Sequence, residues 1–403
     1  MTAADRPRLR AVQVFNVYLE RGGEEKSVDR IRRQMADRWD IRKCFFDSQE
    51  WKAEPKWKAP FQVARMFSNR AAAERLRTAI REHQPDFLLF HNIYPVGSPV
   101  LYRVALEEKI PVVQFIHNFR PFSAGGALWA GDRIAWEALK GDYSAEIKAG
   151  SWQGSRPRTA IMAAVLKRLH RSGWLDGVKG WIGISEFMRD TFIQAGVPAN
   201  RAHALRHCWE PTNTEAPGFP DGEHYLFLSR LVPEKGVATL LAAWAILQER
   251  LGQACPVLVV GGTGSEEKAV EQAAAKSQGT IRFVGFVDGD QKTELLRNSR
   301  AMLAPSIWLE PLGLVTYEAY DFGKPMLAAA SGGLSETVLD GKTGFLHEPG
   351  DAPSLAATIE NLELLSPNQR QDMGAAGHQW LLENTDPGAW STTLGEIVDS
   401  VVK

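Results

Sequence analysis

The sequence predicts a two-domain α/β protein with a doubly wound parallel sheet in each domain. Short apolar runs of strand length alternate with longer stretches in which apolar residues recur every three or four positions, which is the period of a helix. Polar or glycine-rich turns follow these runs, as they do at the carboxyl ends of parallel strands. The length of 403 residues accommodates two domains of ordinary size.

The composition is typical of a soluble globular protein, with 44% hydrophobic and 24% charged residues. The three cysteines (Cys44, Cys208 and Cys255) are widely separated and match no metal-binding or disulfide spacing. The N-terminal stretch MTAADRPRLRAVQVF lacks the apolar core of a secretion signal, and no apolar run approaches the roughly 18 residues of a membrane span. We therefore expect a cytoplasmic protein.

Charge is unevenly distributed along the chain. Residues 1–210 contain 34 basic and 23 acidic side chains, whereas residues 211–403 contain 13 and 25. The basic excess predicts an anionic partner for the first half, such as a membrane surface. Nucleic acid is not expected, because no recognised nucleic-acid-binding motif accompanies the charge. Residues 51–81 mix aromatic and basic side chains, so they form either an interfacial amphipathic stretch or helices with a solvated basic face.

The first half begins with a predicted buried strand over residues 10–17, a glycine pair, and a helix over residues 24–39. Glycine lets the backbone approach a ligand closely, so Gly22 and Gly23 fit either a phosphate-approach loop or an ordinary strand-to-helix turn. The G-x-G-x-x-G fingerprint is absent here, and a dinucleotide site is therefore not predicted.

Two further predicted strands, within residues 86–92 and 111–118, each end in His-Asn. Parallel α/β sheets bind their ligands at the carboxyl ends of strands. His117 is interpreted either as a structural histidine or as a residue that faces a ligand, whereas His91 is interpreted as structural. A linker rich in proline and glycine is predicted over residues 207–224.

The second half starts with a predicted strand that ends on Arg230, followed by Lys235 and an amphipathic helix. Two cations at a strand end and a helix entrance suit two adjacent phosphates of a ligand, although a solvated basic loop is the alternative. The strand and turn VLVVGGTGSEE contain Gly262-x-Gly264 without the third glycine of the dinucleotide fingerprint. Gly262 is therefore expected to approach a nucleoside or its phosphates.

The stretch APSIWLEPLGLVTYEA joins a predicted strand to a helix from about Leu312. Glu310 lies in the loop before the helix and Glu318 about two turns inside it. Gly313 near the helix entrance leaves backbone N–H groups free for a phosphate or sugar oxygen. The two carboxylates either bind hydroxyl groups of one ligand or are ordinary surface charges of a helix.

These segments resemble the donor-binding half of retaining GT-B glycosyltransferases of the family 4 type. The resemblance rests on the E-x7-E motif formed by Glu310 and Glu318, on SRLVPEKGVATLL and on LVVGGTGSEE. It is strong over residues 225–350 and looser over residues 10–210. The sequence departs from the family at Leu312, where phenylalanine is usual, and leucine preserves an apolar contact.

The resemblance implies a GT-B architecture with two Rossmann-like domains facing across a cleft. Residues 1–210 would form the acceptor-side domain, residues 211–385 the domain that binds the donor, and residues 386–403 a helix that crosses back onto the first domain. The donor would be a nucleotide-diphosphate-sugar, with no metal and no other cofactor. Asp288-Gly-Asp290 spells an acidic pair typical of metal sites, but it precedes a predicted helix and is interpreted as an N-cap.

The resemblance further implies roles for individual side chains. Arg230 and Lys235 would bind the diphosphate, and Glu318 would bind the ribose hydroxyls. Glu310 would bind the sugar hydroxyls, and His117 would approach the transferred sugar from the first domain. The other expected substrate-binding positions are Gly22, Gly23, Gly262, Gly285, Phe286, Val287, Leu312, Gly313 and Leu314.

The implied activity is that of a hexosyltransferase that moves a sugar, with retention of anomeric configuration, to a lipid-linked or oligosaccharide acceptor. Such an acceptor would belong to cell-surface polysaccharide or glycolipid synthesis, and the enzyme would be peripheral on the inner face of the membrane. Two alternatives remain open. One is an epimerase-like GT-B enzyme that processes the nucleotide-sugar, and the other is a catalytically silent protein that only binds it.

Overall fold

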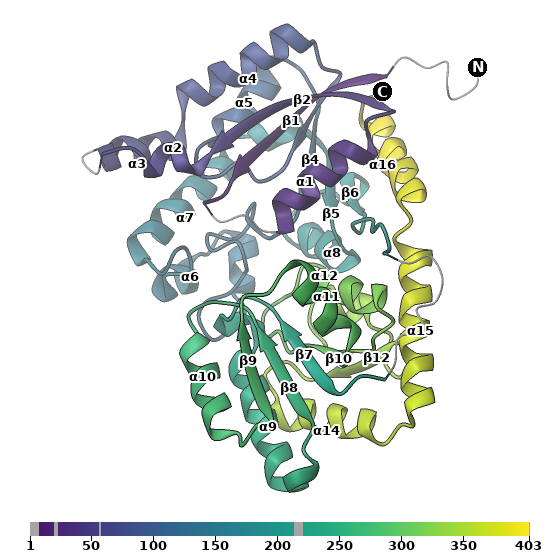
Figure 1. Ribbon diagram of the computed structural model, residues 1–403. Helices are drawn as coiled ribbons and strands as arrows, with labels where there is room; N and C mark the ends of the chain where they lie inside the picture. Colours follow the sequence, from purple (N-terminus) through teal and green to yellow (C-terminus); the bar gives the residue numbers. More distant parts are fainter. Residues whose placement is uncertain (1–7, 20–22, 56–57, 213–220, 403) are drawn as a thin grey trace. The chain divides into compact units, whose positions relative to one another are not determined.

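The computed structural model describes residues 8–19, 23–55, 58–212 and 221–402 (Figure 1). The chain forms two compact units. The first unit contains the chain up to His207 together with the last helix, which begins at Pro387, and the second unit runs from Cys208 to Asp386. Each unit is built on a parallel six-stranded sheet, so the predicted α/β class with two doubly wound sheets is confirmed.

The sheet of the first unit has the strand order β2-β1-β3-β4-β5-β6. All of its strand pairs are parallel. The order reverses between β1 and β3, and such a switch point opens a crevice for ligands at the carboxyl ends of the strands. The strands are β1 (Leu9–Val17), β2 (Trp39–Asp47), β3 (Phe87–Phe90), β4 (Val112–Ile116), β5 (Val178–Gly183) and β6 (Ala202–Ala204).

Helices connect these strands, and the last helix of the chain also packs on this sheet. A Cβ atom at Gly180 of β5 would lie 3.1 Å from Val401, and Trp390 packs against Phe115 of β4 with 6.5 Å between ring centroids. The helices are α1 (Gly23–Gln34), α2 (Ser48–Lys52), α3 (Ala59–Phe67), α4 (Arg70–His83), α5 (Val100–Glu107), α6 (Ser144–Ala149), α7 (Arg156–Arg171), α8 (Glu186–Gln194) and α16 (Pro387–Val402).

Strand β2 was not predicted, and the helix expected over residues 24–39 ends at Gln34. Trp39 belongs to the new strand and packs edge-on against Phe87, with ring centroids 4.9 Å apart. The predicted helix extends to Trp39 because this residue is apolar. Trp39 is buried as the first residue of a strand and is not part of the helix. Strand β2 lies at the end of the strand order, and its exposed charged residues Asp40, Arg42 and Lys43 weaken the apolar signal.

No helix in the described part of the chain combines the length and hydropathy that a transmembrane span requires. The sequence left open whether residues 51–81 form an interfacial amphipathic stretch or helices with a solvated basic face. Two aromatic side chains of this segment differ in their exposure to solvent. Phe61 of α3 is 62% exposed, whereas Trp51 has the guanidinium of Arg65 over its ring, 5.1 Å from the centroid.

The sheet of the second unit has the order β12-β11-β10-β7-β8-β9 and is also parallel throughout. The order reverses between β7 and β10, as in dinucleotide-binding folds. The strands are β7 (His224–Leu228), β8 (Val257–Gly261), β9 (Ile281–Gly285), β10 (Ser299–Ala304), β11 (Met326–Ala329) and β12 (Gly344–His347).

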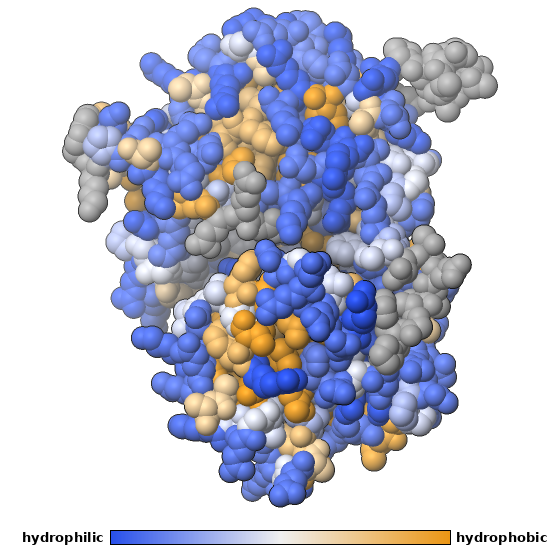
Figure 2. All heavy atoms as spheres, viewed as in Figure 1, coloured by the Kyte–Doolittle hydropathy of each residue, from blue (hydrophilic) through white to orange (hydrophobic). Residues whose placement is uncertain are grey.

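The core of the second unit lies between this sheet and its helices. Trp244 is fully buried there, packs edge-on against Tyr225, and donates a 3.0 Å hydrogen bond to the carbonyl of Pro256. The helices are α9 (Val237–Leu251), α10 (Glu267–Lys276), α11 (Gly289–Arg297), α12 (Leu314–Asp321), α13 (Leu334–Thr337), α14 (Ala352–Glu363) and α15 (Pro367–Asn384). On the face shown in Figure 2, apolar residues gather over β8 and β9.

Replacement of Trp244 by alanine should lower the free energy of unfolding of the second unit by about 3–5 kcal/mol, because it leaves a large cavity and removes a buried hydrogen bond. The measurement is urea denaturation followed by circular dichroism. Leu364, which is 84% exposed, is the control, and its replacement by alanine should change stability by less than about 0.5 kcal/mol. Equal effects of the two substitutions would contradict the assignment of this core.

Candidate functional site

An ion pair marks the switch point of the second unit. Lys235 follows β7 in a short 3₁₀ turn (Pro233–Lys235), and Glu310 follows the neighbouring strand β10. The Nζ of Lys235 donates to Oε2 of Glu310 at 2.7 Å. The same oxygen accepts hydrogen bonds from Ser306 Oγ at 3.1 Å and from Trp308 Nε1 at 3.0 Å. The lysine and glutamate side chains are only 17% and 14% exposed, so water screens their attraction weakly.

The two loops approach closely because glycine stands where they meet. Gly236 has a φ of +77°, and a Cβ atom at this position would lie 1.8 Å from the carbonyl oxygen of Pro305. Gly332 and Gly333 fix the other side of the Glu310 loop. A Cβ atom at Gly332 would lie 2.3 Å from the carbonyl oxygen of Glu310, and the amide of Gly333 donates to that oxygen at 2.7 Å. The glycines therefore hold Glu310 in place through its backbone.

Glu318 lies on α12, away from the hydrogen bonds around Glu310, and pairs with Lys292 of α11. Lys292 Nζ donates to Glu318 Oε1 at 2.6 Å, and the side chains are 31% and 26% exposed. The sequence did not single out Lys292 as a site residue, although it lies two residues after the Asp288-Gly-Asp290 segment. Helix α12 begins at Leu314, so Glu318 lies about one turn inside it and not two. Gly313 has a φ of +84°, and this left-handed backbone prevents an earlier start.

The other predicted donor-site residues also lie beyond carboxyl ends of this sheet. The Arg230 side chain is 66% exposed and lies 3.9 Å from Glu234. Gly262 has a φ of +137°, and its amide N–H donates to the carbonyl of Gly285 at 2.7 Å. A Cβ atom at Gly262 would lie 1.8 Å from a carbonyl oxygen in the loop that follows β7. Phe286 is 70% exposed. Of the remaining predicted positions, Leu312 and Gly313 are buried, and Leu314 and Val287 are half-buried.

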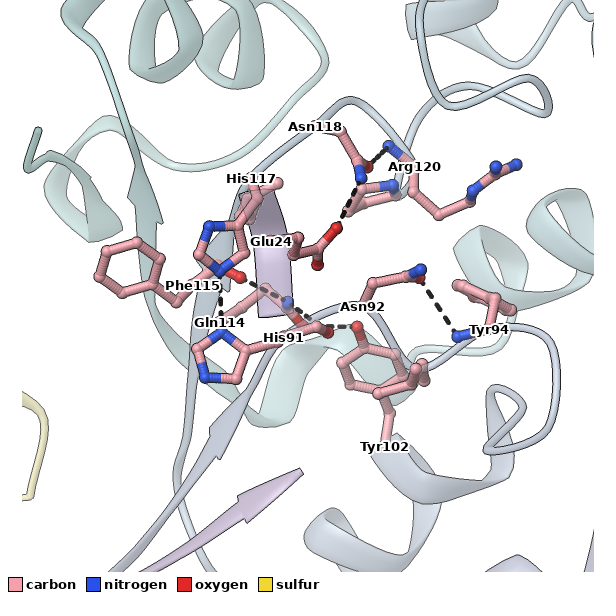
Figure 3. A pocket seen from close by; sticks show the side chains of 13 residues that line it. Glu24, His91, Asn92, Tyr94, Tyr102, Gln114, Phe115, His117, Asn118 and Arg120 are labelled. Carbon is pink, nitrogen blue, oxygen red and sulfur yellow. Dashed lines mark hydrogen bonds between the residues drawn. The ribbon is translucent and has the colours of Figure 1, made fainter. Parts of the chain in front are cut away.

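The first unit contains three buried histidines whose imidazoles are linked in a row, His91, His117 and His207. Figure 3 shows the first two of them, which follow β3 and β4. Nδ1 of His91 lies 3.0 Å from Nε2 of His117, and Nδ1 of His117 lies 3.3 Å from Nε2 of His207. The amide of Gln13 completes the chain, since its Nε2 lies 3.1 Å from the carbonyl of Val28 and 3.0 Å from Nε2 of His91.

The Gln13 amide determines which ring nitrogen donates and which accepts in each hydrogen bond of this row of histidines. Its nitrogen must donate to the Val28 carbonyl, so its second hydrogen points at His91 Nε2, which accepts. In the neutral chain, Nδ1 of His91 then donates to His117, and Nδ1 of His117 donates to His207. Both ring nitrogens of His117 are therefore occupied, and a sugar would meet the carbon edge or the face of this ring.

Burial keeps the three histidines uncharged. It lowers the pKa of His117 to about 3 and lowers the pKa values of His91 and His207 well below their usual range. The rings lie edge to edge, with centroids 5.2 Å apart and interplanar angles of 29° between His91 and His117 and 15° between His117 and His207. The structural interpretation of His91 agrees with its place in this network.

Glu24 lies beside His117 and was not singled out by sequence reasoning. It is the second residue of α1 and accepts hydrogen bonds at Oε2 from the phenol of Tyr18 (2.6 Å) and from Nδ2 of Asn118 (3.1 Å). Burial raises the pKa of Glu24 to about 7, against the opposing effect of the Tyr18 hydrogen bond. Its position directly after a glycine pair was the available signal. Gly23 starts α1 and is exposed, whereas Gly22 lies outside the described residues.

Within the described residues, the structure contains no group of three or more His, Cys, Asp or Glu side chains arranged to hold a metal ion.

Comparison with protein families accounts for both units. Residues 211–380 match the model of glycosyl transferases group 1, and residues 22–207 match the glycosyl transferase 4-like domain. The chain belongs to the family 4 type of GT-B glycosyltransferases. Relatives within the family include the GDP-mannose-dependent α-(1-6)-phosphatidylinositol monomannoside mannosyltransferase of Mycolicibacterium smegmatis, which is 34% identical over 190 residues. The glycogen synthase of Mycobacterium tuberculosis is 34% identical over 171 residues.

These two alignments cover 45% and 41% of this family 4 chain, and 49% and 39% of the relatives. The chain thus spans about half or less of the curated relatives that it matches. Solved structures resemble it over nearly the full length at low identity. Anabaena HepE in complex with UDP has a TM-score of 0.66 and 17% identity, covering 97% of this chain and 100% of its own. A glycosyltransferase from Rickettsia africae has a TM-score of 0.69 and 16% identity, covering 99% and 100%. These likenesses show the GT-B fold.

The buried histidines should make the stability of the first unit fall on acidification. Below the unfolded pKa of about 6.5, the unfolded chain gains a proton at each of these histidines whereas the native chain does not, so stability decreases as pH falls toward the lower native pKa. His207→Phe keeps a ring beside Phe115 but removes one such site. The slope of unfolding free energy against pH between about 6 and 4 should therefore be shallower in the variant by about one proton.

The measurement is urea denaturation at a series of pH values. Between pH 7.5 and 8.5 the histidines are neutral in both states, so the slopes of wild type and His207→Phe should coincide there. Identical slopes below pH 6 would show that His207 titrates in the native protein, contrary to its burial.

Proposed function

We propose that this protein transfers a sugar from a nucleotide-diphosphate-sugar to an acceptor hydroxyl, with retention of anomeric configuration. Membership of the family supports the reaction class. The single observation that carries the proposal is the Lys235–Glu310 pair at the switch point of the second unit, where parallel α/β sheets bind their ligands. The pair offers a cation for the diphosphate and a carboxylate for sugar hydroxyls at one place.

Donor binding would exchange the partners of this pair. The diphosphate would attract Lys235 away from Glu310, because two phosphates carry more charge than one carboxylate. Glu310 would then accept hydrogen bonds from sugar hydroxyls while Ser306 and Trp308 keep its orientation. Arg230, whose side chain is largely exposed, would fold onto the same diphosphate. Both cations would stabilise the charge that develops on the leaving phosphate.

The nucleoside would be bound along the same edge of the sheet. Glu318, held by Lys292, would accept hydrogen bonds from the ribose hydroxyls. The exposed ring of Phe286 would pack against the base. Gly262 would allow the backbone to approach the nucleotide, since this position has no room for a side chain.

The chemistry proposed is a front-face displacement in which the departing phosphate takes the proton of the acceptor hydroxyl. The alternative two-step route needs a carboxylate nucleophile beneath the anomeric carbon, and Glu310 is assigned to the sugar hydroxyls in this proposal. Positioning and charge stabilisation would then supply most of the rate. His117 would form part of the sugar pocket through its ring face, with its nitrogens held by His91 and His207.

A lipid-linked acceptor is proposed for two reasons. One curated relative is described as acting on a phosphatidylinositol monomannoside. The basic excess of residues 1–210 and the exposed Phe61 would also favour an anionic membrane surface. An oligosaccharide acceptor remains the alternative within the same proposal.

Donor binding can be tested with a thermal-shift panel of UDP-, GDP- and ADP-sugars. One of these should raise the melting temperature, because a ligand that binds only the native state adds about 2.7 kcal/mol of stability at 100 times its Kd. Lys235→Ala should weaken donor binding by about tenfold or more, whereas Lys342→Ala, at an exposed turn, should not. Equal shifts in both variants would contradict the diphosphate role of Lys235.

The reaction can be tested by incubation of the preferred donor with an acceptor lipid extract. The product should carry the sugar with the anomeric configuration of the donor, as measured by the anomeric proton coupling in NMR. Inversion would overturn the proposed stereochemistry. An epimerised nucleotide-sugar formed without acceptor would indicate the epimerase-like alternative, and donor binding without turnover would indicate a silent binding protein.

A further inference from the structure

We propose that a small cavity beside Glu24 is a binding site for one substrate hydroxyl, whose hydrogen is accepted by Oε1 of Glu24. This inference rests on the proposed glycosyl transfer and adds a residue to it, since both substrates of such a reaction are polyols. The role assigned to Glu24 is that of a direct substrate ligand in the first unit.

The location of Glu24 is that of a ligand site. It follows β1 at the start of α1, and Asn118, which contacts it, follows β4. Asn92, which follows β3, donates to the phenol oxygen of Tyr18, and Tyr18 in turn donates to Glu24. Loops after three neighbouring strands therefore meet at Glu24, at the point where the strand order of this sheet reverses.

The two carboxylate oxygens of Glu24 differ in their partners. Oε2 accepts from Tyr18 and Asn118, whereas Oε1 is buried and has no partner of good hydrogen-bond geometry among the described residues. The backbone amide of Asn92 lies near the carboxyl group and lowers its pKa, but it does not satisfy Oε1 at hydrogen-bond geometry. An unpaired buried acceptor lowers stability, so such an atom in a native structure calls for a missing partner. Tyr18 and Asn118 already hold the side chain in one orientation, and a partner for Oε1 would meet a preorganised oxygen.

The adjoining space fits a single hydroxyl. The cavity has a volume of about 10 Å3, which is close to the smallest that holds one oxygen. Figure 3 shows Glu24, His117, Asn118 and Arg120 around this cavity. An O–H group in it would donate to Glu24 Oε1.

The charges around the cavity restrict its ligand to a neutral donor. Arg120 is fixed by the carbonyl groups of Ala124 and Gly125, so its positive charge disfavours a cation. The carboxylate of Glu24 itself disfavours a phosphate or another carboxylate. His91 and His117 add no charge, because burial keeps both neutral. A sugar or polyol hydroxyl satisfies all of these conditions.

Glu24→Gln tests the site because it inverts the hydrogen-bonding character of the cavity. Tyr18 and Asn118 both donate to Oε2, so a glutamine would keep its carbonyl oxygen there and direct its NH2 group into the cavity. An acceptor thereby becomes a donor with almost no change of shape. At pH 8, where the native carboxylate is ionised, kcat/KM for transfer should fall by about 10- to 100-fold, the range for a lost hydrogen bond to a charged group.

The source of the hydroxyl can be distinguished in the same experiment. A raised KM for the acceptor with unchanged hydrolysis of the donor in water would assign the cavity to an acceptor hydroxyl. A matching fall in donor hydrolysis would assign it to the transferred sugar. Asp29→Asn, which removes an exposed carboxylate from the same helix, is the control and should retain wild-type kinetics.

Failure of this inference differs from failure of the proposed function. The thermal shift produced by the free nucleoside diphosphate should be the same in wild type and Glu24→Gln, which shows that the variant is folded and that the donor site is intact. Wild-type values of kcat and of both KM values in Glu24→Gln would overturn the hydroxyl site and leave the proposed transfer standing. Absence of turnover in the wild type with every donor would overturn the proposed transfer, and this site with it.

Discussion

The contact between Lys235 and Glu310 depends on two loops that are 75 residues apart in sequence and meet because β7 and β10 are parallel neighbours. The carboxyl ends of both strands then face the same edge of the sheet. The missing side chain of Gly236 lets the chain pass the carbonyl of Pro305. Either charge alone would be unfavourable at its present burial, so the pair forms only where the backbone brings both together. A substrate that replaces one partner must therefore carry charge or several hydroxyl groups.

The sheet of the first unit also has a point where the strand order reverses, but the groups around that point differ in charge from those of the second unit. The switch point of the first unit collects uncharged polar groups, the three histidines and two asparagines, together with Arg120 and one carboxyl group whose pKa burial raises to about 7. The second unit collects paired charges at the corresponding place. Under the proposed function, the hydrogen-bonding groups of the first unit would suit sugar hydroxyls, whereas the ion pairs of the second unit would suit a diphosphate.

In both units, the side chains predicted to contact the ligand are held in place by neighbouring residues that are not themselves predicted to contact it. Ser306 and Trp308 orient the carboxylate of Glu310, and Gly332 and Gly333 hold its backbone. Gln13, in strand β1, determines which nitrogens donate in the hydrogen bonds between the histidines. Apart from Trp308, these positions do not stand out by residue type, because serine, glutamine and glycine are common in loops and strands. Their roles appear only when their partners are known.

The sequence by itself determined the α/β class, most of the strands, and the loops that carry Lys235, Glu310 and His117, because apolar period and turn residues are local properties of the chain. The tertiary structure alone decided the partners: Lys292 for Glu318, 26 residues away, and Asn118 for Glu24, 94 residues away. It also decided the edge strand β2, whose exposed charged residues interrupt its apolar pattern and conceal its pairing with β1. Hydrogen bonds and ion pairs form between whichever side chains the sheet order brings together, and residue spacing along the chain does not encode that order.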